Sequence, residues 1–238
     1  MRAVILASGM ARRLSPLTDN LPKCLVDVAG VTILERIVSS LLKNNVDDIV
    51  ITTGYLEDKI KNFIQQKFPQ LKVLYVRNSD YEKTNYIYSF YLAKEAIGDD
   101  DIVLLHADLV FEPILMQKII NQKKSGVLLK RTLPYPEKDF KASIKNGLVN
   151  KIGVDIKGEN LRFLAPIYKF VKDDLKKILD KTEEFVNSGR TNCYLEDAFN
   201  EISSQVLLWP VYFDNEFCME IDDFEDLDKA RKYFALLK

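Results

Sequence analysis

The sequence has few cysteines, almost no net charge and no long apolar run. Cys24, Cys193 and Cys218 are far apart, odd in number and without the spacing of a metal site, which indicates a reducing compartment. The 34 basic and 35 acidic residues leave a net charge of −1, so the overall charge does not indicate electrostatic binding to nucleic acid. No apolar run approaches the ~20 residues of a membrane helix, and Ala3–Ala7 is too short for the core of a signal peptide. We expect a cytoplasmic protein with neither a nucleic-acid nor a membrane partner.

Length and composition are those of an ordinary globular chain. The 238 residues are 47% hydrophobic and 29% charged, which fits one large α/β domain or two small ones. The sequence contains no repeat, low-complexity tract or linker. We therefore predict one domain over residues 1–238, with a regular first half (1–130) and an elaborated second half (131–238).

Strand and helix patterns alternate along the first half. Apolar runs predict buried strands at 2–7, 48–53, 72–76, 101–105 and 126–130, and periodic segments predict helices at 32–44, 56–67, 87–97 and 113–121. This alternation predicts a Rossmann-like α/β fold with a mixed, mostly parallel sheet flanked by helices. Ligands bind beyond the carboxyl ends of such strands. The loops after Ala7 and after Leu105 should therefore face one crevice.

The pattern changes in the second half. Asn146-Gly147 is a strong turn signal and predicts a hairpin of 142–146 with 148–153. Further strands are expected at 164–170 and 206–211, and helices at 171–186, 195–203 and 224–237.

The loop after the first strand has the chemistry of a triphosphate site. It reads Leu6-Ala7-Ser8-Gly9-Met10-Ala11-Arg12-Arg13-Leu14, with Pro22-Lys23 following. Small residues after a buried strand offer backbone N–H groups to phosphate oxygens. Arg12 or Arg13 supplies a planar fork and Lys23 a point charge. The loop contains neither a Walker sequence nor a dinucleotide fingerprint. The alternative is a plain basic surface loop.

This segment resembles the signature of the nucleotidyltransferase superfamily that activates sugar phosphates and amino-alcohol phosphates. The matches to its pattern are Leu6, Ala7, Ser8, Gly9, Arg13, Leu14, Pro16, Leu17, Thr18, Pro22, Lys23 and Leu25. Ala11 departs from it, because the superfamily usually has a second glycine there; a positive φ at Ala11 would be strained. The resemblance implies a GT-A-like nucleotidyltransferase fold, with a nucleotide-binding first half and an acceptor-binding second half.

Two acidic motifs suit a metal ion. Asp108 follows a predicted central strand, and Asp222 lies in Met219-Glu220-Ile221-Asp222-Asp223. Mg²⁺ prefers one or two carboxylates together with phosphate oxygens and water, and the superfamily similarly uses an Asp from each motif. Alternatively, Asp108 only ends a strand, and Asp222 or Asp223 only caps the helix that follows. We favour Asp223 as the cap, and a packing or hydrogen-bonding role for the sole histidine, His106.

A third segment, from Asn78 to Phe90, narrows the nucleotide. It resembles the N-x-x-[YF]-x-x-T-N-N-x-Y-S-L segment of cytidylyltransferases acting on phosphocholine and 2-aminoethylphosphonate, with Tyr86 in place of the second Asn. Thr84 or Asn85 could instead only cap the next helix. The predicted nucleotide-binding set is Leu6, Ala7, Ser8, Gly9, Met10, Ala11, Arg12, Asn78, Thr84, Asn85, Ser89 and Ala107.

The acceptor is expected over the second half. Lys141 and Lys151 are candidates for its phosphate, although a solvated lysine face explains most of the local lysines. A cationic head group would need aromatic rings and a carboxylate. The candidates for that role are Tyr135, Phe140, Tyr168, Tyr194, Glu196 and Asp197.

The only tryptophan, Trp209, lies in an apolar strand, and Leu195 stands where the resemblance leads us to expect one. This disfavours a trimethylammonium cage and leaves a primary amine, an amino acid phosphate or another phosphonate open.

The resulting hypothesis is CMP transfer from CTP to a small phosphorylated or phosphonylated acceptor, such as phosphocholine or 2-aminoethylphosphonate. Asp108 and Asp222 would hold Mg²⁺, Lys23 would stabilise charge, and Arg13 would steady the terminal phosphates. One alternative is a sugar-1-phosphate nucleotidyltransferase that uses UTP or dTTP. The other is a regulatory domain that binds a nucleotide without catalysis.

Overall fold

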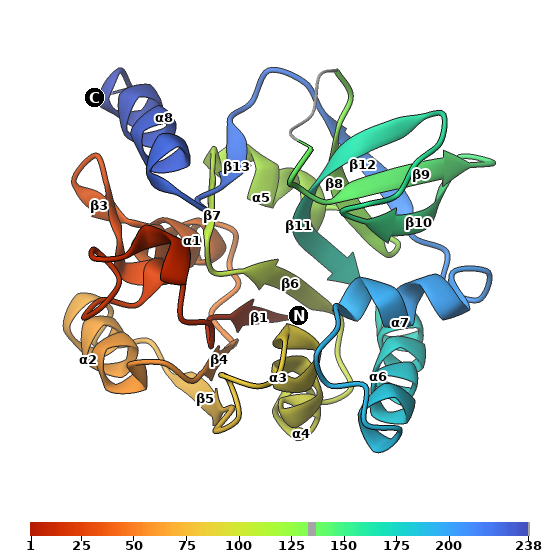
Figure 1. The fold of residues 1–238 in the computed structure, drawn as a ribbon, viewed down its shortest axis with the longest axis horizontal. Helices are drawn as coiled ribbons and strands as arrows, with labels where there is room; N and C mark the ends of the chain where they lie inside the picture. Colours follow the sequence, from red (N-terminus) through yellow and green to blue (C-terminus); the bar gives the residue numbers. More distant parts are fainter. Residues whose placement is uncertain (133–136, 238) are drawn as a thin grey trace.

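The computed structural model describes residues 1–132 and 137–237 of the chain. One nine-stranded sheet has the order β10-β9-β11-β6-β1-β4-β5, and β8 and β12 join it through β11 (Figure 1). β1, β4, β5 and β6 are parallel, whereas β11 runs antiparallel to β6, β8 and β9. This is the mixed sheet that the sequence predicted. Its strands are β1 (Arg2–Leu6), β4 (Ile49–Thr53), β5 (Val73–Arg77), β6 (Ile102–His106), β8 (Gly126–Lys130), β9 (Lys141–Lys145), β10 (Leu148–Gly153), β11 (Leu161–Phe170) and β12 (Trp209–Phe213).

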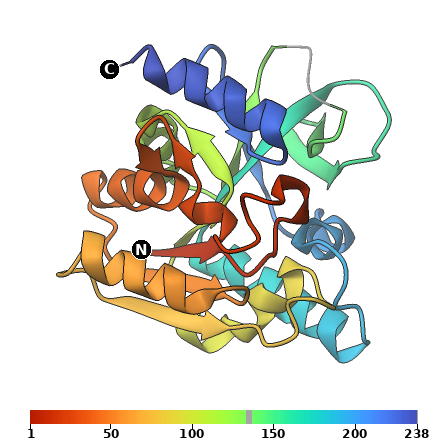
Figure 2. The ribbon, with the colours of Figure 1, turned by 60° about the vertical axis from the view of Figure 1, so that its left-hand side comes forward.

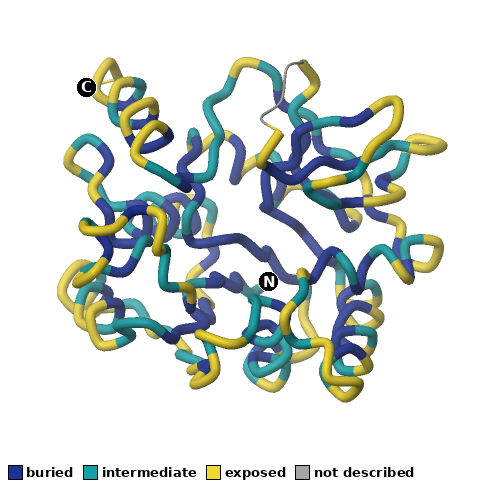
Figure 3. The backbone as a smooth tube through the Cα atoms, in the orientation of Figure 1, coloured by how far each residue is buried: buried dark blue, intermediate teal, exposed yellow. Residues whose placement is uncertain are grey.

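Helices cover both faces of the sheet because its central strands are apolar on both sides. In β1, Ala3 and Ile5 pack into one core, and Val4 and Leu6 into the other. Figure 3 shows the central strands buried along their length and the peripheral loops exposed. The first core includes α1 (Ile33–Lys43), α2 (Glu57–Lys67), α5 (Pro113–Ile120) and α8 (Phe224–Ala235), and the second includes α3 (Tyr86–Leu92), α4 (Lys94–Ile97), α6 (Lys172–Asn187) and α7 (Leu195–Ile202). No helix in the described ranges is long and apolar enough to cross a membrane.

The strand β11 connects the two halves of the chain. Its last residues pair with β6 of the first half, and its first residues pair with β9 of the second half. The C-terminal helix α8 returns to the first half and packs against α1 and the short strand β2 (Asp27–Val28) (Figure 2). The sheet and α8 therefore bring segments from both ends of the sequence to one site.

Most predicted elements are present, with ends shifted by a few residues, and one prediction was wrong in more than its ends. The helix predicted at 87–97 is two helices, α3 and α4, separated at Ala93. The strand predicted at 206–211 begins only at Trp209, because Val206 and Leu208 are buried in the second core before the strand starts.

Two short ladders were not predicted from the sequence. They are β2 with β3 (Val31–Thr32), and β7 (Leu109–Phe111) with β13 (Cys218–Glu220). Strands of two or three residues are too short for a periodic pattern.

Candidate active site

The β7–β13 ladder joins the two acidic motifs. β7 follows the end of central strand β6 after a two-residue turn, and Leu109 pairs with Glu220 of β13. The backbone N–H of Ile221 donates a hydrogen bond to the carbonyl oxygen of Asp108 at 3.0 Å. Asp108 and Asp222 therefore come together through backbone pairing, although they lie far apart in the sequence.

Lys23 lies between the two aspartates. Its ammonium donates to Oδ2 of Asp108 at 2.7 Å and to Oδ1 of Asp222 at 2.9 Å. Burial alone would lower the pKa of Lys23, but the two carboxylates outweigh it, so the pKa is raised and Lys23 stays charged. Burial would likewise raise the pKa of Asp108, but Lys23 and His106 hold it below its ordinary value. The site is thus a charged cluster at neutral pH.

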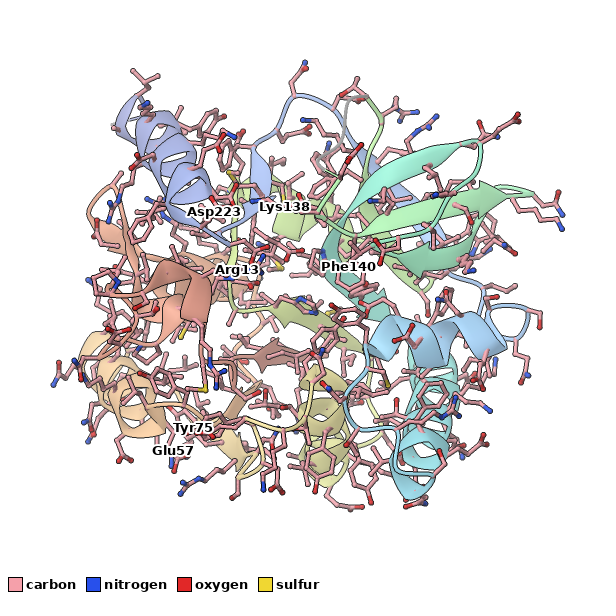
Figure 4. All side chains as sticks on the ribbon, in the orientation of Figure 1. Arg13, Glu57, Tyr75, Lys138, Phe140 and Asp223 are labelled. Atoms are coloured by element: carbon pink, nitrogen blue, oxygen red, sulfur yellow. The ribbon has the colours of Figure 1, made fainter. Side chains whose placement is uncertain are left out.

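Arg13 reaches the same cluster from the loop after β1. Its guanidinium lies 2.8 Å from Oδ1 of Asp222, and its side chain is 66% exposed. Figure 4 labels Arg13, Lys138 and Phe140 in the middle of the molecule, between the N-terminal loops and the strands of the second half. Arg12 instead points to the sulfur of Met10, at 3.5 Å. The structure therefore assigns the planar fork to Arg13.

Ala11 has the backbone conformation that the sequence flagged. Its φ of 50° and ψ of 47° place it in the left-handed region, directly before the short 3-10 helix Arg12–Leu14. The hydroxyl of buried Thr18 donates to the carbonyl oxygen of Ala11 at 2.9 Å and helps hold the turn. The loop thus takes the path that glycine favours, at the cost of local strain.

The charged cluster opens into a cavity of about 360 Å³, here called the main cavity. A smaller cavity of about 170 Å³ lies beside it, and both are lined by Leu6, Gly9, Asn85, Tyr86, His106 and Asp108. Residues from the second half, including Phe140 and Tyr194, line only the main cavity. The arrangement therefore offers two adjoining compartments, with the charged cluster in the wall of the main cavity and Asp108 shared by both.

Comparison with known proteins gives the family. Residues 2–142 match the nucleotidyl transferase family. The chain belongs to this family. It is 25% identical over 252 aligned positions to a CTP:phosphoglutamine cytidylyltransferase from Campylobacter jejuni, covering 96% of this chain and 98% of that protein. It is 28% identical to a choline-phosphate cytidylyltransferase from Haemophilus influenzae, covering 95% and 94%. The protein is thus an enzyme of the nucleotidyltransferase class.

Solved structures agree on the fold. The CTP:phosphocholine cytidylyltransferase from Streptococcus pneumoniae superposes with a TM-score of 0.83, at 23% identity and with 98% of each chain covered. At that identity the likeness concerns the fold alone. It confirms the predicted Rossmann-like nucleotidyltransferase architecture.

Most predicted nucleotide-site residues of this nucleotidyltransferase line one of the two cavities. The predicted residues of the first half and of the acidic motifs that do so are Leu6, Ala7, Ser8, Gly9, Ala11, Arg13, Lys23, Thr84, Asn85, Ala107, Asp108 and Asp222. Asn85 is also the N-cap of α3, where its side chain accepts from the N–H of Tyr86 at 2.8 Å. Likewise Asp223 caps α8, as favoured from the sequence, by accepting from the N–H of Asp226 at 3.0 Å.

Asn78 and Ser89, two predicted nucleotide-binding residues, are not among the described residues that line either cavity. Each is only 1% exposed. Ser89 shares a hydrogen bond of 2.7 Å with the hydroxyl of Ser8 and accepts one from the amide of Asn78 at 3.0 Å. The pair therefore supports the loop at Ser8 from behind. Met10 and Arg12 are also not among the described lining residues of either cavity.

The predicted acceptor residues separate into two groups. Phe140 and Tyr194 line the main cavity, with ring centroids 5.0 Å apart in an edge-to-face arrangement. Lys151 is exposed on β10, and the ammonium of buried Lys141 donates to the carbonyl oxygen of Glu137 at 2.7 Å. Neither lysine is among the described residues that line the main cavity. Tyr135, a further candidate, lies outside the described residues.

Three other predicted acceptor residues form hydrogen bonds within the protein. Glu196 is 3% exposed and accepts from the phenols of Tyr86 and Tyr168, the latter at 2.5 Å. Asp197 accepts from the N–H of Tyr194 at 2.8 Å and so caps α7. Tyr168, Glu196 and Asp197 therefore have internal partners and do not face the main cavity.

Several residues of the main cavity were not predicted, among them Glu220, Asp139 and Tyr86. Glu220 belongs to the second acidic motif, and burial together with repulsion from Asp108 and Asp222 raises its pKa. Asp139 is 7% exposed, and burial raises its pKa to about 6. Tyr86 stood out only as a departure from the cytidylyltransferase pattern. A carboxylate beside a lysine-rich stretch gives no sequence signal, because only folding shows which residues face a cavity.

A metal could lie within the same cluster. One potential ligand atom from each of His106, Asp108 and Glu220 lies within 4.8 Å of the others. Nε2 of His106, Oδ1 of Asp108 and Oε1 of Glu220 are buried without a hydrogen-bond partner among the described residues. Buried polar atoms are nearly always paired. His106, Asp108 and Glu220 are therefore a candidate set of metal ligands.

Proposed function

We propose that this nucleotidyltransferase transfers CMP from CTP to a small phosphorylated or phosphonylated acceptor and releases pyrophosphate. The observation that carries the proposal is the ammonium of Lys23, held by Asp108 and Asp222 in the wall of the main cavity, with Asp108 also lining the smaller cavity. The base of a nucleotide in the smaller cavity would place its phosphates at this cluster in the main cavity, and the acceptor would approach from the second-half side of the main cavity. The named activities of the Campylobacter and Haemophilus relatives support CTP as the donor.

The reaction is an in-line displacement at the α-phosphorus. An anionic oxygen of the acceptor forms the new P–O bond, and the bond from the α-phosphorus to the oxygen that bridges it to the β-phosphorus breaks. Pyrophosphate leaves with that electron pair. The acceptor oxygen is already ionised, so no general base is required. Lys23 contributes a buried positive charge, and Arg13 offers two parallel N–H donors at the mouth of the site.

Mg²⁺ fits the residues present. Asp108 and Glu220 would hold it, with Asp222 in the same wall of the main cavity, since Mg²⁺ binds through carboxylates and phosphate oxygens. The fit rests on Oδ1 of Asp108 and Oε1 of Glu220, two buried oxygens that lack a partner in the described part of the chain. When bound, Mg²⁺ supplies positive charge that offsets the charge developing on the leaving pyrophosphate.

The second-half residues favour an acceptor that carries an amino or ammonium group. Phe140 and Tyr194 present aromatic surfaces to the main cavity, and the carboxyl of Asp139 lies in the same wall. Aromatic rings with a nearby carboxylate are the usual setting for such a cation. Choline phosphate and 2-aminoethylphosphonate, the acceptors in the names of two relatives, have this chemistry.

The direct test is product formation from each of four nucleoside triphosphates with a panel of acceptors. The panel contains phosphocholine, phosphoethanolamine, 2-aminoethylphosphonate, phosphorylated amino acids and sugar 1-phosphates, each with Mg²⁺ and with EDTA. We expect a CMP-linked product, detected by mass spectrometry and ³¹P NMR, together with one equivalent of pyrophosphate. A Lys23→Ala protein with an unchanged circular dichroism spectrum serves as the control for contaminating activity.

Two other outcomes would overturn the proposal. A product from UTP or dTTP with a sugar 1-phosphate, and none from CTP, would make the protein a sugar nucleotidyltransferase. Saturable CTP binding without turnover of any acceptor would instead indicate a regulatory nucleotide-binding protein.

A further inference from the structure

Tyr86 stands at the boundary between the two compartments. It begins α3, and it lines both the main cavity and the smaller cavity. Its ring meets that of His106 with centroids 4.5 Å apart, and that of Tyr194 at 5.6 Å. One aromatic side chain therefore contacts the residue next to the acidic cluster and an aromatic residue of the acceptor half.

A buried carboxylate fixes this ring in place. The phenol of Tyr86 donates to Oε2 of Glu196 on α7, and the phenol of Tyr168 on β11 donates to Oε1. Burial and the neighbouring Glu196 raise the pKa of both phenols well above the ordinary value, so both remain donors at neutral pH. Three elements from both halves of the chain thus determine where Tyr86 lies.

Glu196 depends on these two phenols. It is 3% exposed, and no lysine or arginine forms an ion pair with it within the described ranges. A buried carboxylate without a cation is costly unless hydrogen bonds satisfy it. With Tyr86 in position, both carboxylate oxygens are occupied and Glu196 does not line the main cavity. Removing the Tyr86 phenol would leave Oε2 without a donor beside that cavity.

We propose that Tyr86 determines acceptor specificity by covering Glu196. While Tyr86 is in place, the acceptor head group meets Tyr86, Phe140, Tyr194 and Asp139, and the space stays suited to a small head group. Without its ring, the cavity extends toward a buried negative charge and accepts a larger cation. This inference rests on the proposed function, because it assigns the residue that selects the acceptor in that reaction.

The test compares Tyr86→Phe and Tyr86→Asn with the wild type, using phosphocholine and phosphoethanolamine as competing probes. Tyr86→Phe keeps the ring but removes the donor to Glu196. We expect its kcat/KM for phosphoethanolamine to fall about tenfold, with the KM for CTP within about twofold of wild type. Tyr86→Asn removes the ring, and we expect the phosphocholine-to-phosphoethanolamine ratio of kcat/KM to rise at least about tenfold.

Two further variants separate specificity from folding. Tyr88→Phe is the matched control, because Tyr88 lies on the same helix, stacks on Tyr91 and is not among the described residues lining either cavity. Tyr88→Phe should leave the kcat/KM for phosphoethanolamine and the phosphocholine-to-phosphoethanolamine ratio of kcat/KM unchanged. In Tyr86→Asn/Glu196→Gln the buried charge is absent, so the gain for phosphocholine should disappear. A melting temperature for each variant shows that it is folded.

The outcomes distinguish this inference from the proposed function. A wild-type enzyme that forms no CMP-linked product from any acceptor contradicts the proposed function, and the role of Tyr86 with it. The role of Tyr86 is contradicted, and the proposed function is not, if the wild type is active and both Tyr86 variants are folded with a phosphocholine-to-phosphoethanolamine ratio of kcat/KM within about twofold of the wild-type ratio. The same conclusion follows if only the KM for CTP changes, because Tyr86 would then belong to the nucleotide compartment.

Discussion

The ammonium of Lys23 lies 2.9 Å from Oδ1 of Asp222, although the two residues are 199 positions apart in the sequence. Oδ1 also meets the guanidinium of Arg13, and the same ammonium binds Asp108. The positive charges that a triphosphate needs are therefore held in place, before any nucleotide binds, by the carboxylates that suit a metal ion. Such preorganised charge does not have to reorient during the reaction.

Replacing Lys23 by alanine should lower kcat about 10²–10³-fold, comparable to the loss of one preorganised donor in an active site. The readout is steady-state cytidylyl transfer under saturating substrates. Lys67→Ala, which removes a half-exposed lysine paired with Glu35 on α1, is the matched control and should retain full activity. Near-normal turnover of a folded Lys23→Ala protein would refute the role assigned to Lys23.

Asp108→Asn and Asp222→Asn should each weaken divalent-ion binding at least about tenfold, because each removes one negative charge from the proposed site. Binding is measured by titrating Mn²⁺ in the presence of CTP and following the free ion by electron paramagnetic resonance. EDTA should abolish transfer without changing the circular dichroism spectrum, and Mg²⁺ should restore it. If both variants bind Mn²⁺ as tightly as the wild type, then Asp108 and Asp222 are not ligands of the ion.

Ala11→Gly should stabilise the protein by about 0.5–1 kcal/mol. An alanine at φ 50° is strained by about 1–2 kcal/mol, and the added freedom of glycine in the unfolded chain offsets part of the gain. For a chain of this size the melting temperature should rise by about 1–4 °C. Ala96→Gly, inside helix α4, should change stability in the opposite direction. A lower melting temperature for Ala11→Gly would show that the methyl group has a favourable contact that exceeds the strain.

Glu216→Gln should remove a pH-dependent contribution to stability. A hydrogen bond from Lys118, with smaller contributions from backbone N–H groups, lowers the pKa of Glu216 to about 2 in the folded protein. A depressed pKa stabilises the fold above the ordinary glutamate value of about 4.3, and that stability is lost as the pH falls toward 2.

The wild type should therefore exceed Glu216→Gln by up to about 1 kcal/mol in unfolding free energy at pH 7, as for other solvent-accessible ion pairs. The difference should shrink below pH 4. Urea unfolding at pH 7, 5 and 3.5 measures it, with the exposed Glu159→Gln as control. A difference that is constant across this range would show that the pair contributes through packing and not through charge.

Sequence patterns predicted the parts of the site that lie in one continuous segment, but they did not predict which side chains face the cavities. The loop from Leu6 to Arg13 is continuous in sequence, so its residue types and spacing predicted its place at the end of a buried strand. Asn78 and Ser89 were recognised as part of the site, but a motif does not show whether a polar side chain faces a cavity or supports the wall behind it. For the same reason the sequence did not show that Glu196 is buried, since its hydrogen-bond partners come from α3 and β11.

The sequence by itself determined the fold class, the phosphate loop and the two acidic motifs. Each depends on interactions within a short segment, such as an apolar strand, a turn or a helix cap. Only the tertiary structure decided that Lys23 bridges Asp108 and Asp222, that Arg13 and not Arg12 joins them, and that Tyr86 covers Glu196. Those contacts depend on the β7–β13 ladder and on the packing of α3 against α7. Pairing between distant segments leaves no periodic trace in the sequence, because it is selected only when the whole core folds.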